Sequence, residues 1–180
     1  MGRTTLACAA VVGLSALGCG GNSLPRVSDA RPPAPPAGWI KNEYRDHGFE
    51  CFVPGYTQEH KDDPTLVGAG TSYVCVTPES VYVAWVSREG EEEPVAEPDL
   101  SSHIETMKSF GHKILDSGMR ARQGLRGFGI SYETEDGLTI VEEIYFRGPK
   151  AYVFAVVGED GSVRERPETK QFFDCIRFLN

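Results

Sequence analysis

The sequence of 180 residues lacks the short motifs that mark many catalytic and metal-binding sites. It contains no Cys-x-x-Cys and no His-Glu-x-x-His, the patterns that indicate dithiol redox or zinc sites. It also contains neither Gly-x-Ser-x-Gly nor Ser-x-x-Lys, which place a serine nucleophile in several hydrolase families. From the sequence we therefore predict no catalytic residue, no metal ligand and no cofactor.

Positive charge is scarce as well. The chain has 18 Lys and Arg residues against 26 Asp and Glu residues, which gives a formal net charge of −8 at pH 7. An acidic protein repels phosphate backbones, and no basic stretch with interleaved aromatic residues offsets that repulsion. We therefore predict no nucleic-acid partner.

The apolar run at the N-terminus is too short to cross a bilayer. It extends from Leu6 to Leu17, whereas a membrane-spanning helix needs about 20 apolar residues. Arg3 precedes the run, and small residues surround Cys19 at its end. A positive start, a short apolar stretch and a small-residue exit are typical of a secretory signal.

The end of this signal resembles the lipobox of bacterial lipoproteins. Ala16, Leu17 and Gly18 precede Cys19, although most lipoboxes have leucine where this chain has Ala16. The resemblance implies that signal peptidase II removes residues 1–18 and that Cys19 carries acyl chains such as palmitate. Gly20 follows the cysteine rather than Asp, which by the same resemblance implies the outer rather than the inner membrane. The alternative is an ordinary signal peptide with an incidental cysteine.

The segment after Cys19 has the composition of a tether. Residues 20–38 contain five prolines and almost no large apolar side chains, so they cannot bury enough surface to fold. Proline favours an extended chain, which reaches roughly 60 Å at about 3.1 Å per residue. We assign residues 19–38 to the lipidated cysteine and its tether, and residues 39–180 to a single folded domain.

The folded part is predicted to be mostly β-structure. Pro78-Glu79 and Asp136-Gly137 are turn pairs between β-branched and aromatic stretches. The predicted strands cover residues 48–54, 71–77, 80–87, 126–135, 138–147 and 151–157.

Two helices complete the predicted fold. Ser102 and Glu105 form a capping box, and the apolar period continues through Met107 to Ile114 and Leu115. Pro167 begins the second helix. This order predicts the α+β class, with an antiparallel sheet of about six strands flanked by two main helices.

Both ends of the predicted domain resemble PsbP/Mog1-like domains. The resemblance is carried by Gly48-Phe49-x-x-x-Val53-Pro54 at the start and by residues 172–178 (FFDCIRF) at the end. The middle of the pattern is matched by a helix, then Gly124 and Gly127, then a meander whose last strand contains residues 150–153 (KAYV). It covers about residues 39–180, although Cys175 replaces the usual serine. The resemblance implies a PsbP/Mog1-like fold and a binding or assembly role, because most of the family is not enzymatic.

Three cysteines fall in the predicted domain, and an exported protein can form a disulfide. Cys51 lies in a predicted strand and Cys175 near the end of the last helix. A Cys51–Cys175 disulfide is one prediction, and Cys75 is the alternative partner of Cys51. Three buried, unpaired thiols are the other interpretation, since a free cysteine packs as a small hydrophobic residue.

The remaining polar groups favour ordinary surface roles. His103 and His112 are predicted to lie on opposite faces of one helix, where they cannot share a metal. Glu142 and Glu143 are consecutive strand residues and point to opposite faces. The acidic run at residues 91–93 lacks the alternating ligands of a calcium loop, so we interpret it as a solvated surface.

These observations favour a non-catalytic lipoprotein of the cell envelope. We predict that the protein attaches to the membrane through its lipid anchor and that its partner is an envelope protein. The alternative hypothesis is a small envelope hydrolase whose site is assembled from residues distant in sequence.

The anchor is tested by substituting its cysteine. We expect Cys19→Ser to abolish incorporation of labelled palmitate and to move the protein from the membrane to the soluble fraction, because two or more acyl chains are needed for durable anchoring. Cys8→Ser removes the other cysteine of the N-terminal segment, and it should change neither palmitate incorporation nor membrane localisation. Equal palmitate incorporation in the Cys19→Ser protein would show that position 19 is not the lipidated residue.

Overall fold

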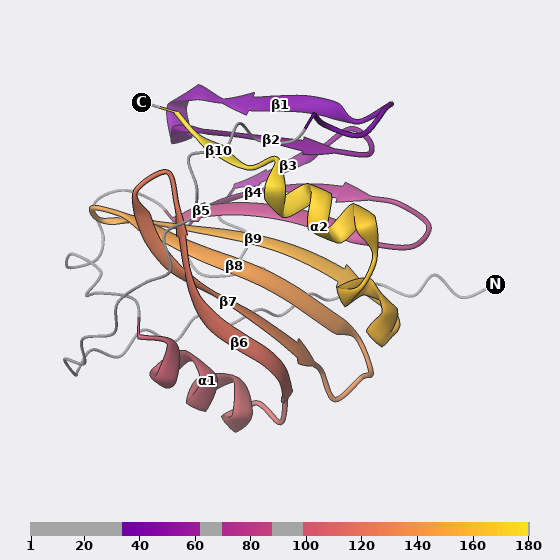
Figure 1. Ribbon diagram of the computed structural model, residues 1–180, viewed down its shortest axis with the longest axis vertical. Helices are drawn as coiled ribbons and strands as arrows, with labels where there is room; N and C mark the ends of the chain where they lie inside the picture. Colours follow the sequence, from indigo (N-terminus) through magenta and orange to yellow (C-terminus); the bar gives the residue numbers. More distant parts are fainter. Residues whose placement is uncertain (1–33, 62–69, 88–98, 180) are drawn as a thin grey trace.

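The computed structural model describes residues 34–61, 70–87 and 99–179. The signal peptide, Cys19, most of the tether and the acidic run at residues 91–93 lie outside these ranges. The described part contains two antiparallel β-sheets and two α-helices (Figure 1).

The larger sheet has seven strands in the order β3-β4-β5-β9-β8-β7-β6. The smaller has three, in the order β1-β2-β10. The strands are β1 Ile40–Tyr44, β2 Phe49–Val53, β3 Gln58–Lys61, β4 Gly70–Val76, β5 Val81–Ser87, β6 Lys113–Arg122, β7 Leu125–Glu133, β8 Thr139–Arg147, β9 Lys150–Gly158 and β10 Arg177–Phe178.

The helices cover opposite sides of the large sheet. α1 (Leu100–Ser109) lies on one face, while α2 (Pro167–Asp174) lies with the three-stranded sheet on the other (Figure 1). Two short 3₁₀ helices, η1 (Arg45–His47) and η2 (Gly161–Arg164), follow β1 and β9. Among the described residues, no helix is both long and apolar enough to span a membrane.

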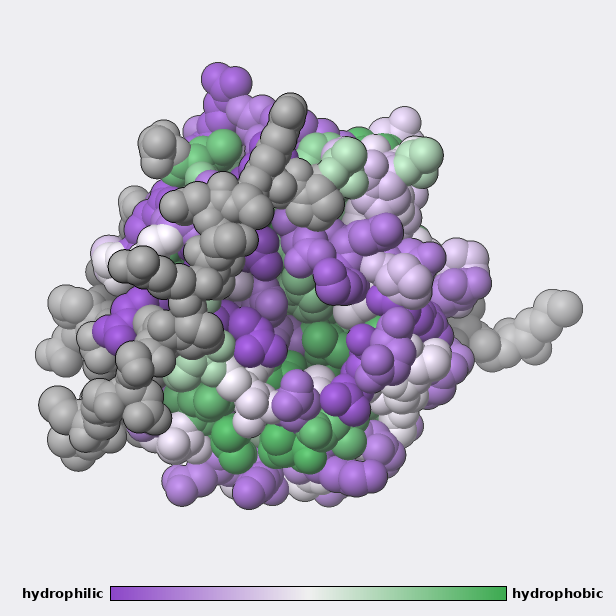
Figure 2. All heavy atoms as spheres, in the orientation of Figure 1, coloured by the Kyte–Doolittle hydropathy of each residue, from purple (hydrophilic) through white to green (hydrophobic). Residues whose placement is uncertain are grey.

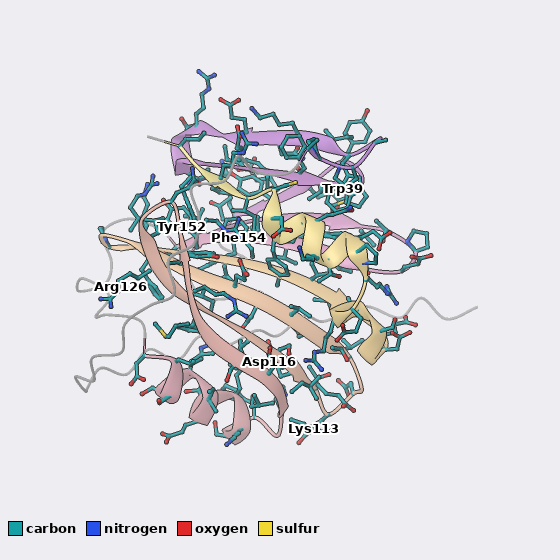
Figure 3. The ribbon with its side chains drawn as sticks, viewed as in Figure 1. Trp39, Lys113, Asp116, Arg126, Tyr152 and Phe154 are labelled. Carbon is teal, nitrogen blue, oxygen red and sulfur yellow. The ribbon has the colours of Figure 1, made fainter. Side chains whose placement is uncertain are left out.

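Aromatic rings join the small sheet to the large one. Phe49 of β2 lies 5.4 Å from Phe154 and 6.0 Å from Tyr152, both on β9, and all three side chains are buried. Phe178 of β10 approaches Tyr152 at 5.1 Å. Figure 3 labels Tyr152 and Phe154 where the two layers meet. Edge-to-face pairs contribute about 0.5–1.5 kcal/mol each beyond the area that they bury, so this cluster fixes the two sheets together.

The opposite face of the large sheet packs against α1. Met107 is buried there against Ile130, Tyr132 and Ile140 of β7 and β8. Figure 2 shows polar residues over most of the visible surface, with hydrophobic residues gathered in its lower half, over β6 and α1.

The α+β class and all six predicted strands are confirmed, but the large sheet has seven strands rather than about six. The predicted helix through Ile114 and Leu115 is wrong, because α1 ends at Ser109 and β6 begins at Lys113. Gly111 has a φ of +78°, a left-handed conformation that ends helices and favours glycine.

The N-terminus of α1 also differs from the prediction. Asp99, rather than Ser102, is the N-cap residue. Its Oδ1 accepts hydrogen bonds from the backbone N–H groups of Ser101 (2.9 Å) and Ser102 (3.3 Å). The Ser102 hydroxyl donates to Asp99 Oδ2 at 2.6 Å. An aspartate can cap a helix as well as a serine can, so the pattern alone did not locate the first turn.

The close approach of β7 and β8 gives a stability prediction. A Cβ atom on Gly127 would collide with the backbone carbonyl oxygen of Ile144, whereas a Cβ atom on Gly161 would have no neighbour within 4 Å. We expect Gly127→Ala to lower the free energy of unfolding by about 1–3 kcal/mol, the usual cost of overpacking. Chemical denaturation measures it. Gly161→Ala is the matched control and should be nearly neutral; equal effects of the two substitutions would contradict the described pairing.

Candidate functional site

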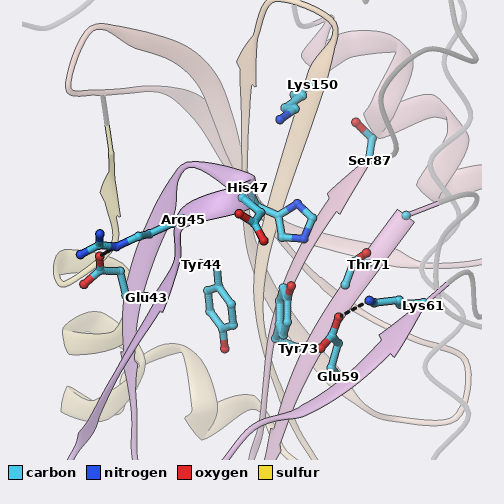
Figure 4. Close-up of a pocket in the computed structure, with 12 residues that line it drawn as sticks. Glu43, Tyr44, Arg45, His47, Glu59, Lys61, Thr71, Tyr73, Ser87 and Lys150 are labelled. Atoms are coloured by element: carbon cyan, nitrogen blue, oxygen red, sulfur yellow. Dashed lines mark hydrogen bonds and ion pairs between the residues drawn. The ribbon is translucent and has the colours of Figure 1, made fainter.

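A groove of about 860 Å³ opens where the end of β1 and η1 separate from β3 and β4 (Figure 4). It lies at the edge of the large sheet, since β3 is the first strand in the sheet order. Its walls combine charged, hydroxyl and aromatic side chains. The lining residues are Glu43, Tyr44, Arg45, Asp46, His47, Glu59, Lys61, Gly70, Thr71, Tyr73, Ser87 and Lys150.

Two stacked tyrosines form the aromatic part of the groove. The ring centroids of Tyr44 and Tyr73 lie 3.8 Å apart, with 27° between the ring planes. The hydroxyl of Tyr44 is 3.1 Å from the hydroxyl of Thr57, which fixes its orientation. Burial raises the pKa of Tyr73 to about 12 and also raises the pKa of Tyr44. Both phenols therefore stay neutral at physiological pH and can donate hydrogen bonds to a ligand.

Charged side chains of both signs line the groove. Arg45 pairs with Glu43 across β1 and η1, and Lys61 lies 3.2 Å from Glu59 on β3. The Arg45 and Lys61 side chains are 82% and 72% exposed, so each pair is worth little to stability and can exchange its partner at low cost. The groove can therefore accept a ligand that carries both charges.

His47 stands at the centre of the lining (Figure 4), with its ring 5.9 Å from that of Tyr73. Burial lowers the pKa of this imidazole, and the nearby Lys150 ammonium lowers it further, while Asp46 and Glu59 act in the opposite direction. Within the described residues no hydrogen bond joins His47 to a carboxylate, so the groove brings a histidine and carboxylates together without forming a dyad.

The three domain cysteines are buried, free thiols in this structure. Cys51 and Cys75 belong to the core between the two sheets, and burial raises the pKa of Cys51 to about 12. Burial likewise raises the pKa of Cys75 and of Cys175. Neither the Cys51–Cys175 bridge nor the Cys51–Cys75 alternative is formed, and the disulfide stays a prediction. As thiols, these residues pack rather than react.

The histidines of the α1 region do not share a helix face, because His112 follows the end of α1. His112 stacks on Tyr132 at 5.1 Å instead. The described residues hold no group of three His, Cys, Asp or Glu side chains that could bind a metal.

Sequence reasoning missed a buried hydrogen bond between a histidine and a carboxylate on the α1 side of the large sheet. His103 Nε2 lies 3.0 Å from Glu142 Oε1, and the two side chains are only 5% and 3% exposed. Glu142 and Glu143 do point to opposite faces as predicted, since Glu143 pairs with Arg122. The sequence feature that could have revealed this contact is Glu142, the single carboxylate between Ile140 and Ile144 on an apolar strand face.

Comparisons with known proteins support the fold alone. No protein-family model and no curated protein matches the chain. The solution structure of cyanobacterial PsbP (CyanoP) from Synechocystis sp. PCC 6803 superposes with a TM-score of 0.60 at 8% sequence identity, covering 87% of this chain and 99% of that one. A protein of unknown function from Pseudomonas aeruginosa gives a TM-score of 0.43 at 8% identity, covering 77% and 95%. The chain therefore has a PsbP-like fold, as the resemblance of its two ends implied.

The groove is tested by titrating its histidine. We expect the His47 imidazole to titrate below the ordinary histidine pKa of about 6.5, and Lys150→Met to raise that pKa because it removes the neighbouring cation. Because the folded state binds this proton less tightly than the unfolded state, His47 destabilises the fold progressively as pH falls below about 6.5. The imidazole resonances in NMR spectra report the titration. A pKa at or above 6.5, or one unmoved by Lys150→Met, would contradict the described surroundings.

Proposed function

We propose that this protein is a lipid-anchored module of the cell envelope that holds an extended segment of a partner protein in the groove beside β3. The observation that carries the proposal is the coincidence of three features in one place. An open groove of about 860 Å³, a sheet edge and charged side chains of both signs meet at Glu59 and Lys61 of β3.

The edge of β3 supports binding of an extended chain. Among the described strands, β3 pairs with β4 alone, and an unpaired strand edge can accept a further strand through backbone hydrogen bonds. Just before β3, Tyr56 is 86% exposed, and Val76 at the end of β4 is 69% exposed. Large apolar side chains exposed beside a strand edge provide contacts that a partner's side chains can cover.

The composition of the groove supports a binding role over chemistry. Its tyrosines stay neutral, and its histidine has no carboxylate partner among the described residues. Two exposed cations, Arg45 and Lys61, pair with Glu43 and Glu59. Such a surface recognises a partner by complementary charge and hydrogen bonds rather than by activating a nucleophile. The N-terminal sequence supports the location, since an acyl anchor at Cys19 and a proline-rich tether would present this groove away from the bilayer.

Site-specific crosslinking in native envelopes tests the proposal. With the photoreactive residue p-benzoylphenylalanine at Tyr56, we expect a discrete adduct with one envelope protein. Lys61→Glu in the same protein should reduce the yield at least about fivefold, because it leaves two carboxylates adjacent on β3 and removes a charge needed for recognition. Immunoblots and mass spectrometry of the adduct measure the yield and identify the partner.

The matched control carries the same photoreactive residue at Phe110, the exposed aromatic residue that follows α1. α1 lies on the opposite side of the large sheet from the groove (Figure 1), so position 110 at its end should give no comparable adduct. The same adduct from both positions, or none from Tyr56 at native expression levels, would overturn the proposal.

A further inference from the structure

A second cavity, of about 210 Å³, lies on the large sheet near its opposite edge, over β6, β7 and β8. η2 and α2 supply its other wall. The lining residues are Asp116, Arg120, Gly129, Ile130, Ser131, Val141, Glu142, Glu143, Arg164, Glu165 and Phe173. None of them lines the groove beside β3.

Small residues on β7 make room for this cavity. Gly129 and Ser131 alternate along the strand and therefore share one face of the sheet with Val141, which is the partner of Ser131 on β8. The Arg120 side chain lies across Gly129, where an added Cβ atom would stand only 3.0 Å from Arg120 Nε. A larger residue at position 129 would displace the guanidinium.

Ser131 carries an unused hydrogen-bonding group in the cavity wall. Ser131 is only 5% exposed, and among the described residues its Oγ has no hydrogen-bond partner. Buried hydroxyls normally have a hydrogen-bond partner. An unpartnered hydroxyl in the wall of a cavity therefore indicates that a bound ligand supplies the partner.

The charges around the cavity divide into paired and unpaired groups. Glu143 is neutralised by Arg122 at 3.3 Å and Arg120 at 3.7 Å, and accepts a hydrogen bond from the Tyr145 hydroxyl at 2.7 Å. By contrast, Asp116 on β6 and Arg164 on η2 make no ion pair or hydrogen bond with other described side chains. Glu165, an exposed residue that follows η2, likewise pairs with no other described side chain, so the cavity keeps one guanidinium and two carboxylates available.

We propose that this cavity binds a small zwitterion of the α-amino-acid class. Arg164 binds its carboxylate, Asp116 binds its ammonium group, and the Ser131 hydroxyl donates a hydrogen bond to a carboxylate oxygen. A cavity of about 210 Å³ has room for an amino acid with a small side chain. This site is independent of the partner groove, and neither depends on the other.

The test is a titration of the full-length protein in detergent micelles with L-alanine, followed by amide chemical shifts in NMR spectra. Acetate and methylammonium serve as probes of the two halves of the ligand. We expect saturable shifts centred on Gly129 and Ser131 with L-alanine and at least about tenfold weaker binding of either half. Arg164→Met and Asp116→Asn should each weaken L-alanine binding at least about tenfold, since each removes a charge-assisted hydrogen bond.

Matched controls carry the same chemical changes elsewhere. Arg45→Met alters an exposed groove residue and Asp136→Asn an exposed turn residue, and neither should change the affinity for L-alanine. Ser131→Ala should weaken binding severalfold without lowering the melting temperature of the free protein, because the hydroxyl has no partner there. No saturable shift with L-alanine, acetate binding as tightly as L-alanine, or affinities unchanged in both Arg164→Met and Asp116→Asn would each overturn the proposal.

Discussion

The contact between the two sheets is the constraint on which the rest of this structure depends. Phe49 and Phe178 of the small sheet close over Tyr152 and Phe154 of β9, and the core that they form reaches from β4 to α2. The small sheet has only three strands, of which one has two residues, so its own hydrogen bonds could not keep it folded. It persists because its aromatic side chains are buried against the larger sheet.

The same arrangement explains why polar cavities lie beside this core. The interlayer contact is concentrated on β2 and β9, whereas β1 runs on into η1 and β3 forms the outer edge of the large sheet. Between those elements the described contact between the layers is the stack of Tyr44 on Tyr73, and exposed charges line the rest of the space. Towards the other edge, glycine and serine on β7 replace the large residues found elsewhere on that face. Both cavities are therefore gaps in apolar packing that polar residues line.

Sequence patterns were sufficient where one local signal dominated. Asp136-Gly137 located the β7–β8 hairpin, and Pro167 located the start of α2. β3, with the sequence QEHK, has no apolar residue to reveal it, and β10 is too short to show a period. Ile114 continued the helical period of α1 although it belongs to β6. The groove could not be predicted, because Tyr44 and Tyr73 are brought together only by the contact between the two sheets.

The position of β1 has a mechanical consequence. The chain before residue 39 enters the fold at Ile40, which pairs with Val53 at the far end of β2. Tension transmitted along that chain therefore acts first on Trp39, whose ring packs against Tyr82 of β5 at 5.7 Å, and then on the Ile40–Val53 pair before the other four pairs of β1. A partner strand bound in the groove beside η1 would contact the end of β1 and stabilise its pairing with β2. Binding of the partner would therefore increase the force needed to detach β1.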